Sequence, residues 1–189
     1  IDWQRVGFVH GVMNTDNLSI LGLTIDYGPY GWLEGYDKNW TPNTTDAEHK
    51  RYAFGSQGKI GLWNLLKLAN ALYPLIEEAD PLEEILSNYK TLFATKHLEM
   101  RKSKIGLELA DENDLKLIDD LETLLRKTET DMTIFFRNLS KVSKGMIIPE
   151  KDDISFLAEI MDAFYKPEEV KGEVLFFWKD WMNRYLIRL

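Results

Sequence analysis

The chain has 189 residues, which is enough for one substantial domain and short for two. Its net charge of −8 argues against a nucleic-acid partner, because such partners are bound by clustered Lys and Arg. It has no cysteine, which excludes disulfides and thiolate metal sites, and no apolar run reaches the roughly 18 residues that a membrane span needs.

The first 58 residues are rich in turn-forming residues. Residues 1–9 resemble the last turns of a helix that starts upstream, so we interpret the chain as part of a longer protein. Residues 18–27 form an apolar run with Gly22 near its middle, which predicts a short β-hairpin or two short strands. Residues 28–52 predict a long ordered loop, and loops of that length are usually functional.

From residue 59 onward, apolar residues recur at helical spacing. The first predicted helix covers residues 59–73 and ends at Pro74, and the second starts at Asp80, where Asp-Pro-Leu-Glu is a typical helix start. A third starts at Asp111 as its cap. The remaining predicted helices cover residues 132–139, residues 154–164, and residues from about Pro167 to the end. We therefore expect a mainly α protein. Residues 1–58 would form its β-hairpin and loop region, residues 59–189 its helical body, and the two together a single domain over 1–189.

The residues that could carry chemistry lie in the first zone. The run His-Gly-Val-Met-Asn-Thr-Asp-Asn ends at Asn17, and Asp26 follows nine residues later. A hairpin between them would bring Asn17 and Asp26 together, and an amide oxygen with a carboxylate suits Mg²⁺ when phosphates complete its shell. Asp16 beside them can orient a hydroxyl or accept its proton. The alternative is that all three are turn residues that cap the hairpin.

This spacing resembles the catalytic loop of protein kinases. In kinases, His-x-Asp-x-x-x-x-Asn precedes a short hairpin and then Asp-Phe-Gly, and the Asn and second Asp hold Mg²⁺. Here His10 and Asn17 keep the spacing, and Asp26 begins an Asp-Tyr-Gly run. The kinase catalytic Asp is replaced by Val12, which cannot act as a base, so Asp16 is the nearby substitute. We interpret His10 as a hydrogen-bonding brace of the loop.

Two runs carry a more specific resemblance. They are HGVMNTDN followed by LSILGLTIDYGPYGWLEGYD, and the run RYAF with Gln57 ahead of WNL and LANAL. Both are similar to the selenoprotein O family, a kinase-like fold whose members act as protein adenylyltransferases. The strong match covers about residues 1–76, and Gly58 replaces the usual Pro. The resemblance implies a helical body like the C-lobe of a protein kinase, with the N-lobe absent from this chain. We expect Asn64 within the second run to make a buried hydrogen bond.

The resemblance also implies an activity. Family members transfer AMP from ATP to Ser, Thr or Tyr hydroxyls of proteins, with Mg²⁺ or alternatively Mn²⁺. Carried over by motif, Asp16 is the catalytic base, Asn17 is a metal ligand, and Asp26 is a metal ligand that also contacts the nucleotide. The expected partners are ATP, protein substrates and the missing N-terminal lobe, without which we expect this chain to be inactive. The expected compartment is the bacterial cytoplasm, or the mitochondrion in a eukaryote.

Two other functions stay open. An atypical kinase would use similar residues but transfer a phosphoryl group in place of AMP. A non-catalytic pseudokinase or helical interaction module is favoured by Val12 at the usual Asp position. The joint presence of Asp16, Asn17 and Asp26 disfavours it, because a site without catalysis has no need of metal ligands.

Overall fold

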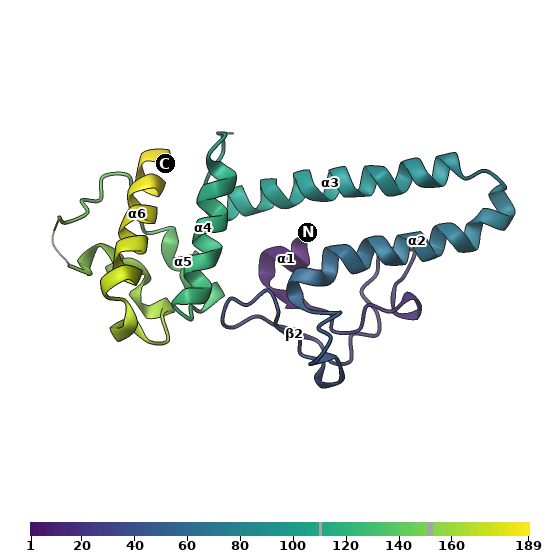
Figure 1. The fold of residues 1–189 in the computed structure, drawn as a ribbon, viewed down its shortest axis with the longest axis horizontal. Helices are drawn as coiled ribbons and strands as arrows, with labels where there is room; N and C mark the ends of the chain where they lie inside the picture. Colours follow the sequence, from purple (N-terminus) through teal and green to yellow (C-terminus); the bar gives the residue numbers. More distant parts are fainter. Residues whose placement is uncertain (110, 151–152) are drawn as a thin grey trace. The chain divides into compact units, whose positions relative to one another are not determined.

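The computed structural model describes residues 1–109, 111–150 and 153–189 (Figure 1). The chain is mainly helical, which confirms the predicted class. It forms two compact units: the first comprises residues 1–33 and 37–97, and the second comprises residues 34–36 and 98–189. The boundary falls within helix α3 (Asp80–Lys104). The single domain expected over 1–189 stays a prediction.

The N-terminal helix is shorter than the sequence predicted. Helix α1 (Asp2–Val6) ends at Gly7, whose φ of 74° is the left-handed conformation that glycine adopts at helix ends. Strand β1 (Phe8–Val9) follows at once and pairs antiparallel with β2 (Gly31–Trp32). The prediction that residues 1–9 are all helical was therefore wrong after Val6. The chain turns at Gly7 and buries both residues of β1.

Residues 18–27 form a turn with one bridge in place of a full hairpin. The 3₁₀ helix η1 (Thr15–Asn17) precedes them, and Leu18 then pairs with Thr24 in an isolated antiparallel bridge. The Gly22 N–H donates to the Ser19 carbonyl at 3.1 Å, and Gly22 has a φ of 74° that suits the reversal. Most side chains here are exposed, so little packing favours a longer ladder.

The predicted long loop is ordered by its own polar contacts. It contains β2 and the 3₁₀ helix η2 (Thr44–Asp46). Asp46 is buried, and its carboxylate accepts the backbone N–H groups of Arg51 and Tyr52 at 2.9 and 2.7 Å. A short 3₁₀ helix, η3 (Phe54–Ser56), then leads into the first long helix.

Helix α2 (Gln57–Ile76) and the part of α3 in the first unit run antiparallel (Figure 1). Two glycines of α2 allow close approach. A Cβ added at Gly58 would lie 2.4 Å from the Phe93 ring, and one at Gly61 would lie 2.7 Å from the Tyr89 hydroxyl. That hydroxyl donates to the Gly58 carbonyl at 3.0 Å. The glycine at position 58 therefore makes room for an aromatic side chain of α3.

The predicted end of this helix at Pro74 was wrong. Pro74 lies inside α2, which continues to Ile76 and ends at Glu77 with a φ of 60°. Proline cannot donate the backbone hydrogen bond of an ordinary helical residue. Only two further residues follow it in α2, so the helix reaches its end before a kink would matter.

The second unit packs its helices around buried aromatic side chains. Its elements are α4 (Asp114–Lys127), α5 (Met132–Leu139), the 3₁₀ helix η4 (Ser155–Ala163), the 3₁₀ turn η5 (Pro167–Glu169) and α6 (Gly172–Arg188). Trp178 and Trp181 of α6 are fully buried, as is Phe135 of α5. The Trp181 Nε1–H donates to the Leu117 carbonyl of α4 at 2.9 Å, which ties α6 to α4.

Two predicted boundaries in this unit were wrong, and one predicted helix has a different geometry. Residues 155–163, within the helix predicted over 154–164, form a 3₁₀ helix. Their apolar spacing suits that geometry as well as an α-helix. The last α-helix begins at Gly172, after the short turn at Pro167. Asp111 does not cap α4: Asn113 is the residue before Asp114, and Asp111 accepts the Asn113 N–H in a local turn. Across the described residues, no helix combines the length and apolar character that crossing a membrane requires.

Candidate functional site

The predicted catalytic loop, residues 10–17, is organised around a fully buried histidine. His10 Nε2 lies 2.7 Å from the Ile25 carbonyl, so this nitrogen carries a proton and donates it. His10 Nδ1 accepts the Val12 N–H at 3.3 Å. Both ring nitrogens are therefore occupied, and His10 braces the loop, as the sequence predicted. The bond to Ile25 also ties the loop to the residue that precedes Asp26.

Helix α2 holds the loop from one side through two buried amides. Gln57 accepts the His10 N–H at 3.1 Å and donates to the Phe8 carbonyl at 2.9 Å. About two turns further along α2, Asn64 donates to the Met13 carbonyl at 2.9 Å. This confirms the buried hydrogen bond expected of Asn64. Backbone groups of β1 and the loop that could not reach water are thereby paired.

The ordered segment after β2 holds the loop at two further points. Asn43 Nδ2 donates to the Gly11 carbonyl at 3.0 Å, and the Tyr52 hydroxyl donates to Asn14 Oδ1. Gly11 has a φ of 82°, and a Cβ there would lie 2.6 Å from the Pro29 carbonyl oxygen. Glycine is therefore required at this position both by its backbone conformation and by the close approach.

Asn17 is oriented by the loop itself. Its Nδ2 donates to the Val12 carbonyl at 3.1 Å. Within the described part of the chain, no donor contacts its Oδ1. An amide whose nitrogen is engaged and whose oxygen stays available fits the role of a hard oxygen ligand.

Asp26 lies just beyond the bridge, next to an aromatic cluster. It is exposed and has a φ of 50°, a left-handed conformation that Asp adopts more readily than most residues. Tyr27 packs its ring 6.3 Å from those of both His10 and Phe8. Together with the bond from His10 to Ile25, this contact fixes the backbone on both sides of Asp26.

The three predicted site residues lie on one connected framework. The register of the Leu18–Thr24 bridge places Asn17 beside the residue before Asp26. Asp16 is exposed on the η1 turn. Over the residues that the structure describes, no hydrogen bond joins the side chains of Asp16, Asn17 and Asp26. In the same described ranges, no group of three or more His, Cys, Asp or Glu side chains is arranged to hold a metal ion. A cation here would need ligands from the nucleotide as well as from Asn17 and Asp26.

Comparison with known proteins decides the family. The family model described as "Protein adenylyltransferase SelO" matches residues 1–189, the whole chain. The chain belongs to the SelO family.

Proteins from three bacteria are similar to this chain over most or all of its length. A protein of Flavobacterium johnsoniae named "Protein nucleotidyltransferase YdiU" is 57% identical over 189 residues, which is 100% of this chain and 35% of that protein. Proteins with the same name from Rhodopirellula baltica and Aromatoleum aromaticum are 49% and 53% identical, over 100% and 88% of this chain. They are covered over 36% and 30% of their own lengths. The chain thus spans about a third of the length of these relatives.

Sequence reasoning missed most of the residues that hold the loop. Asn43 and Tyr52 gave no signal of their contact with the loop, because they reach it across 32 and 38 residues of chain. Gln57 and Asn64 lie on the same face of α2 as Ile60, but the predicted helix began at residue 59 and so left Gln57 out. A polar side chain at a core position of a helix indicates a buried hydrogen bond.

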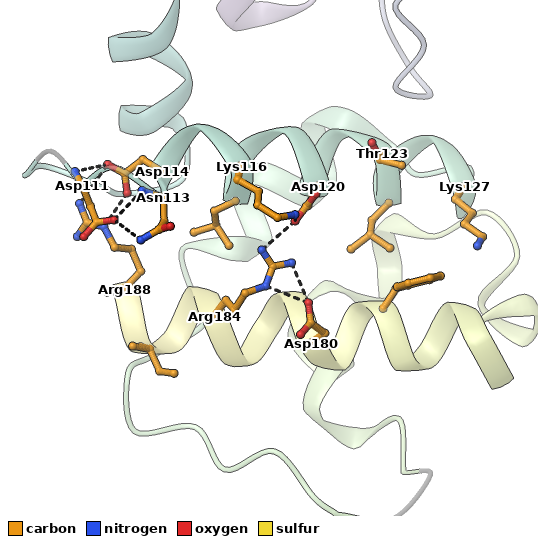
Figure 2. Close-up of a pocket in the computed structure, with 14 residues that line it drawn as sticks. Asp111, Asn113, Asp114, Lys116, Asp120, Thr123, Lys127, Asp180, Arg184 and Arg188 are labelled. Atoms are coloured by element: carbon orange, nitrogen blue, oxygen red, sulfur yellow. Dashed lines mark hydrogen bonds and ion pairs between the residues drawn. The ribbon is translucent and has the colours of Figure 1, made fainter.

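The second unit of this SelO-family chain has a groove of about 1120 Å³ between α4 and α6 (Figure 2). Its charged side chains pair with one another. Asp120 contacts Lys116 and Arg184 at 2.8 Å each, and Arg184 also contacts Asp180 at 2.9 Å. At the other end, Arg188 contacts Asp114 at 2.7 Å. The pairs Arg184–Asp120 and Arg188–Asp114 link α6 to α4, so we assign the groove a structural role.

Proposed function

We propose that this chain is the catalytic-loop and helical part of a protein adenylyltransferase. The full-length protein would transfer AMP from ATP to Ser, Thr or Tyr hydroxyls of protein substrates, with Mg²⁺ or Mn²⁺. Membership of the SelO family supports this reaction class. The observation that carries the proposal is the orientation of Asn17, whose amide nitrogen is engaged by Val12 while its oxygen stays available beside the Asp26 segment.

The residues of the loop would divide the chemistry between them. Asn17 Oδ1 and the Asp26 carboxylate would hold the cation, which when bound neutralises charge on the phosphate oxygens. Asp16 would accept the proton of the substrate hydroxyl as that oxygen forms a bond to the α-phosphorus. The bond from the α-phosphorus to the bridging oxygen breaks, and pyrophosphate leaves. Asp16 suits this role because it is exposed and lies next to Asn17.

The fold proposal follows from the same loop. We expect the helical body to correspond to the C-lobe of a protein kinase, and the lobe that holds most of the ATP to lie in the two thirds of the relatives that this chain does not span. The isolated chain would then lack most nucleotide contacts and transfer no AMP. The braced loop and its link to the Asp26 segment through His10 support this correspondence.

Product mass tests the reaction. The full-length protein is incubated with ATP, Mg²⁺ and a protein substrate mixture, and modified peptides are analysed by mass spectrometry. An added AMP group is expected. Asp26→Ala should lower the yield by about 10²-fold or more, as the loss of a group that stabilises developing charge does. Asp37→Ala is the matched control, because Asp37 is a turn aspartate that accepts the Asn39 N–H at 2.9 Å.

Other outcomes would identify the competing functions. An added phosphate group on the peptides would refute AMP transfer and indicate an atypical kinase. No modification, together with calorimetric binding of Mg²⁺ and ATP that Asp26→Ala leaves unchanged, would indicate a non-catalytic protein. Equal losses in Asp26→Ala and Asp37→Ala would mean that Asp26 acts only as a turn residue.

A further inference from the structure

Asn14 makes an unusual contact at the start of the η1 turn. It occupies the position before Thr15, where an Asn side chain commonly accepts a backbone N–H of the turn that follows. Here its side chain makes no such bond. Its Oδ1 instead accepts the hydroxyl of Tyr52, 38 residues further along the chain. The Asn14 side chain is thus directed by a distant residue and not by its own turn.

Tyr52 is itself fixed by a buried carboxylate. Its backbone N–H donates to Asp46 Oδ2 at 2.7 Å, and the N–H of Arg51 donates to Asp46 Oδ1 at 2.9 Å. The Lys50 N–H donates to the Asp46 carbonyl at 2.7 Å. Charge-assisted bonds of this kind are stronger than neutral ones. The base of the tyrosine side chain therefore has little freedom to follow a movement of the loop.

The same Asn14 also supports the turn that carries the site. Its carbonyl accepts the Asn17 N–H at 3.1 Å, and Asp16 lies between the two residues. We infer that Tyr52 is a positioning residue, which sets the placement of Asp16 and Asn17 through Asn14. Without the hydroxyl, the Asn14 side chain becomes free to bond the N–H groups of its own turn, a competition typical of Asn. The inference rests on the proposed function for its catalytic consequence.

Steady-state kinetics of the full-length protein test the inference. In Tyr52→Phe, kcat for AMP transfer should fall about three- to tenfold while KM for ATP stays unchanged, which is the range expected from one hydrogen bond. Tyr73→Phe is the matched control and should keep wild-type kinetics, because Tyr73 is 48% exposed on α2 and its hydroxyl makes no bond within the described ranges. Asn14→Ala should lower kcat by a similar factor, and adding Tyr52→Phe to it should cause no further loss.

Hydrogen exchange gives a second readout that does not depend on catalysis. Backbone amides in residues 11–18 should exchange about fivefold faster in Tyr52→Phe, while those of α2 keep their rates. Unchanged loop exchange, an effect on KM alone, or multiplicative losses in the double variant would each overturn the inference. If the wild-type protein transfers no AMP but loop exchange still rises in Tyr52→Phe, the proposed function fails and the positioning contact stands.

Discussion

Gln57 offers a direct test of how α2 supports the candidate catalytic loop, residues 10–17. It is 4% exposed, and its amide bonds two backbone groups, the His10 N–H at 3.1 Å and the Phe8 carbonyl at 2.9 Å. Gln57→Met keeps the length and approximate volume of the side chain but removes both bonds. The variant therefore leaves one donor and one acceptor buried without their partner.

The expected cost follows from those two groups. A buried polar group that loses its partner costs about 1–3 kcal/mol, so the pair should cost about 2–6 kcal/mol. Gln4→Met is the control, because Gln4 is only half-buried and makes one bond, to the Phe54 carbonyl at 2.8 Å. Water can reach that site, so Gln4→Met should lower the free energy of unfolding by only about 1 kcal/mol.

Native-state hydrogen exchange of the full-length protein measures the difference. The opening free energy of amides in residues 8–14 should fall by at least about 2 kcal/mol in Gln57→Met, equivalent to roughly 30-fold faster exchange. AMP transfer should fall with it, because the loop is no longer held at His10. A fall no larger than that of Gln4→Met would refute the reasoning, since it would show that the loop does not depend on these two bonds.

Two further predictions concern backbone conformation and pH. Gly11→Ala should abolish most AMP transfer and should raise the hydrogen-exchange rate of the loop far more than Gly22→Ala does. Both glycines have left-handed φ values, but only at Gly11 would an added Cβ lie 2.6 Å from the Pro29 carbonyl oxygen. Equal effects of the two substitutions would contradict this reasoning. Burial alone would raise the pKa of Asp114, but hydrogen bonds from Arg188 and from the backbone outweigh it and hold that pKa below its ordinary value. The stability that this carboxylate contributes is thus present above the unfolded pKa of about 4 and lost as pH falls through the lower folded value. Urea midpoints of wild type and Asp114→Asn should differ at neutral pH and converge below about pH 4, and a pH-independent difference would refute the assignment.

The helices of this chain could be predicted because apolar spacing is a local property. Apolar spacing also leaves some local features undecided. Apolar residues at 154, 157 and 160 suit a period of three as well as one of 3.6, so spacing alone could not distinguish η4 from an α-helix. Gly7 was the signal that the first helix stops, because glycine readily adopts the left-handed conformation found there, and both residues of the strand that follows are buried.

Some residues of the candidate site could likewise be predicted from the sequence, and others could not. Asp16, Asn17 and Asp26 could be proposed from spacing, because one turn brings their backbones together. The residues that hold the loop could not be proposed as its partners, since Asn43 and Tyr52 contact it from a segment without periodicity. The positions of such contacts depend on how a long ordered loop returns to the site. That information lies in the three-dimensional packing and not in residue spacing.

The hydrogen bond from Asn17 to Val12 bears on which residue could act as the base. Asn17 uses the backbone carbonyl at position 12, and any residue there supplies that carbonyl. A valine at this position therefore keeps the orientation of the metal-ligand candidate and offers no carboxylate of its own. His10 is not available either, because both ring nitrogens are engaged. Asp16 is the carboxylate that remains in residues 10–17, and it lies exposed on the η1 turn.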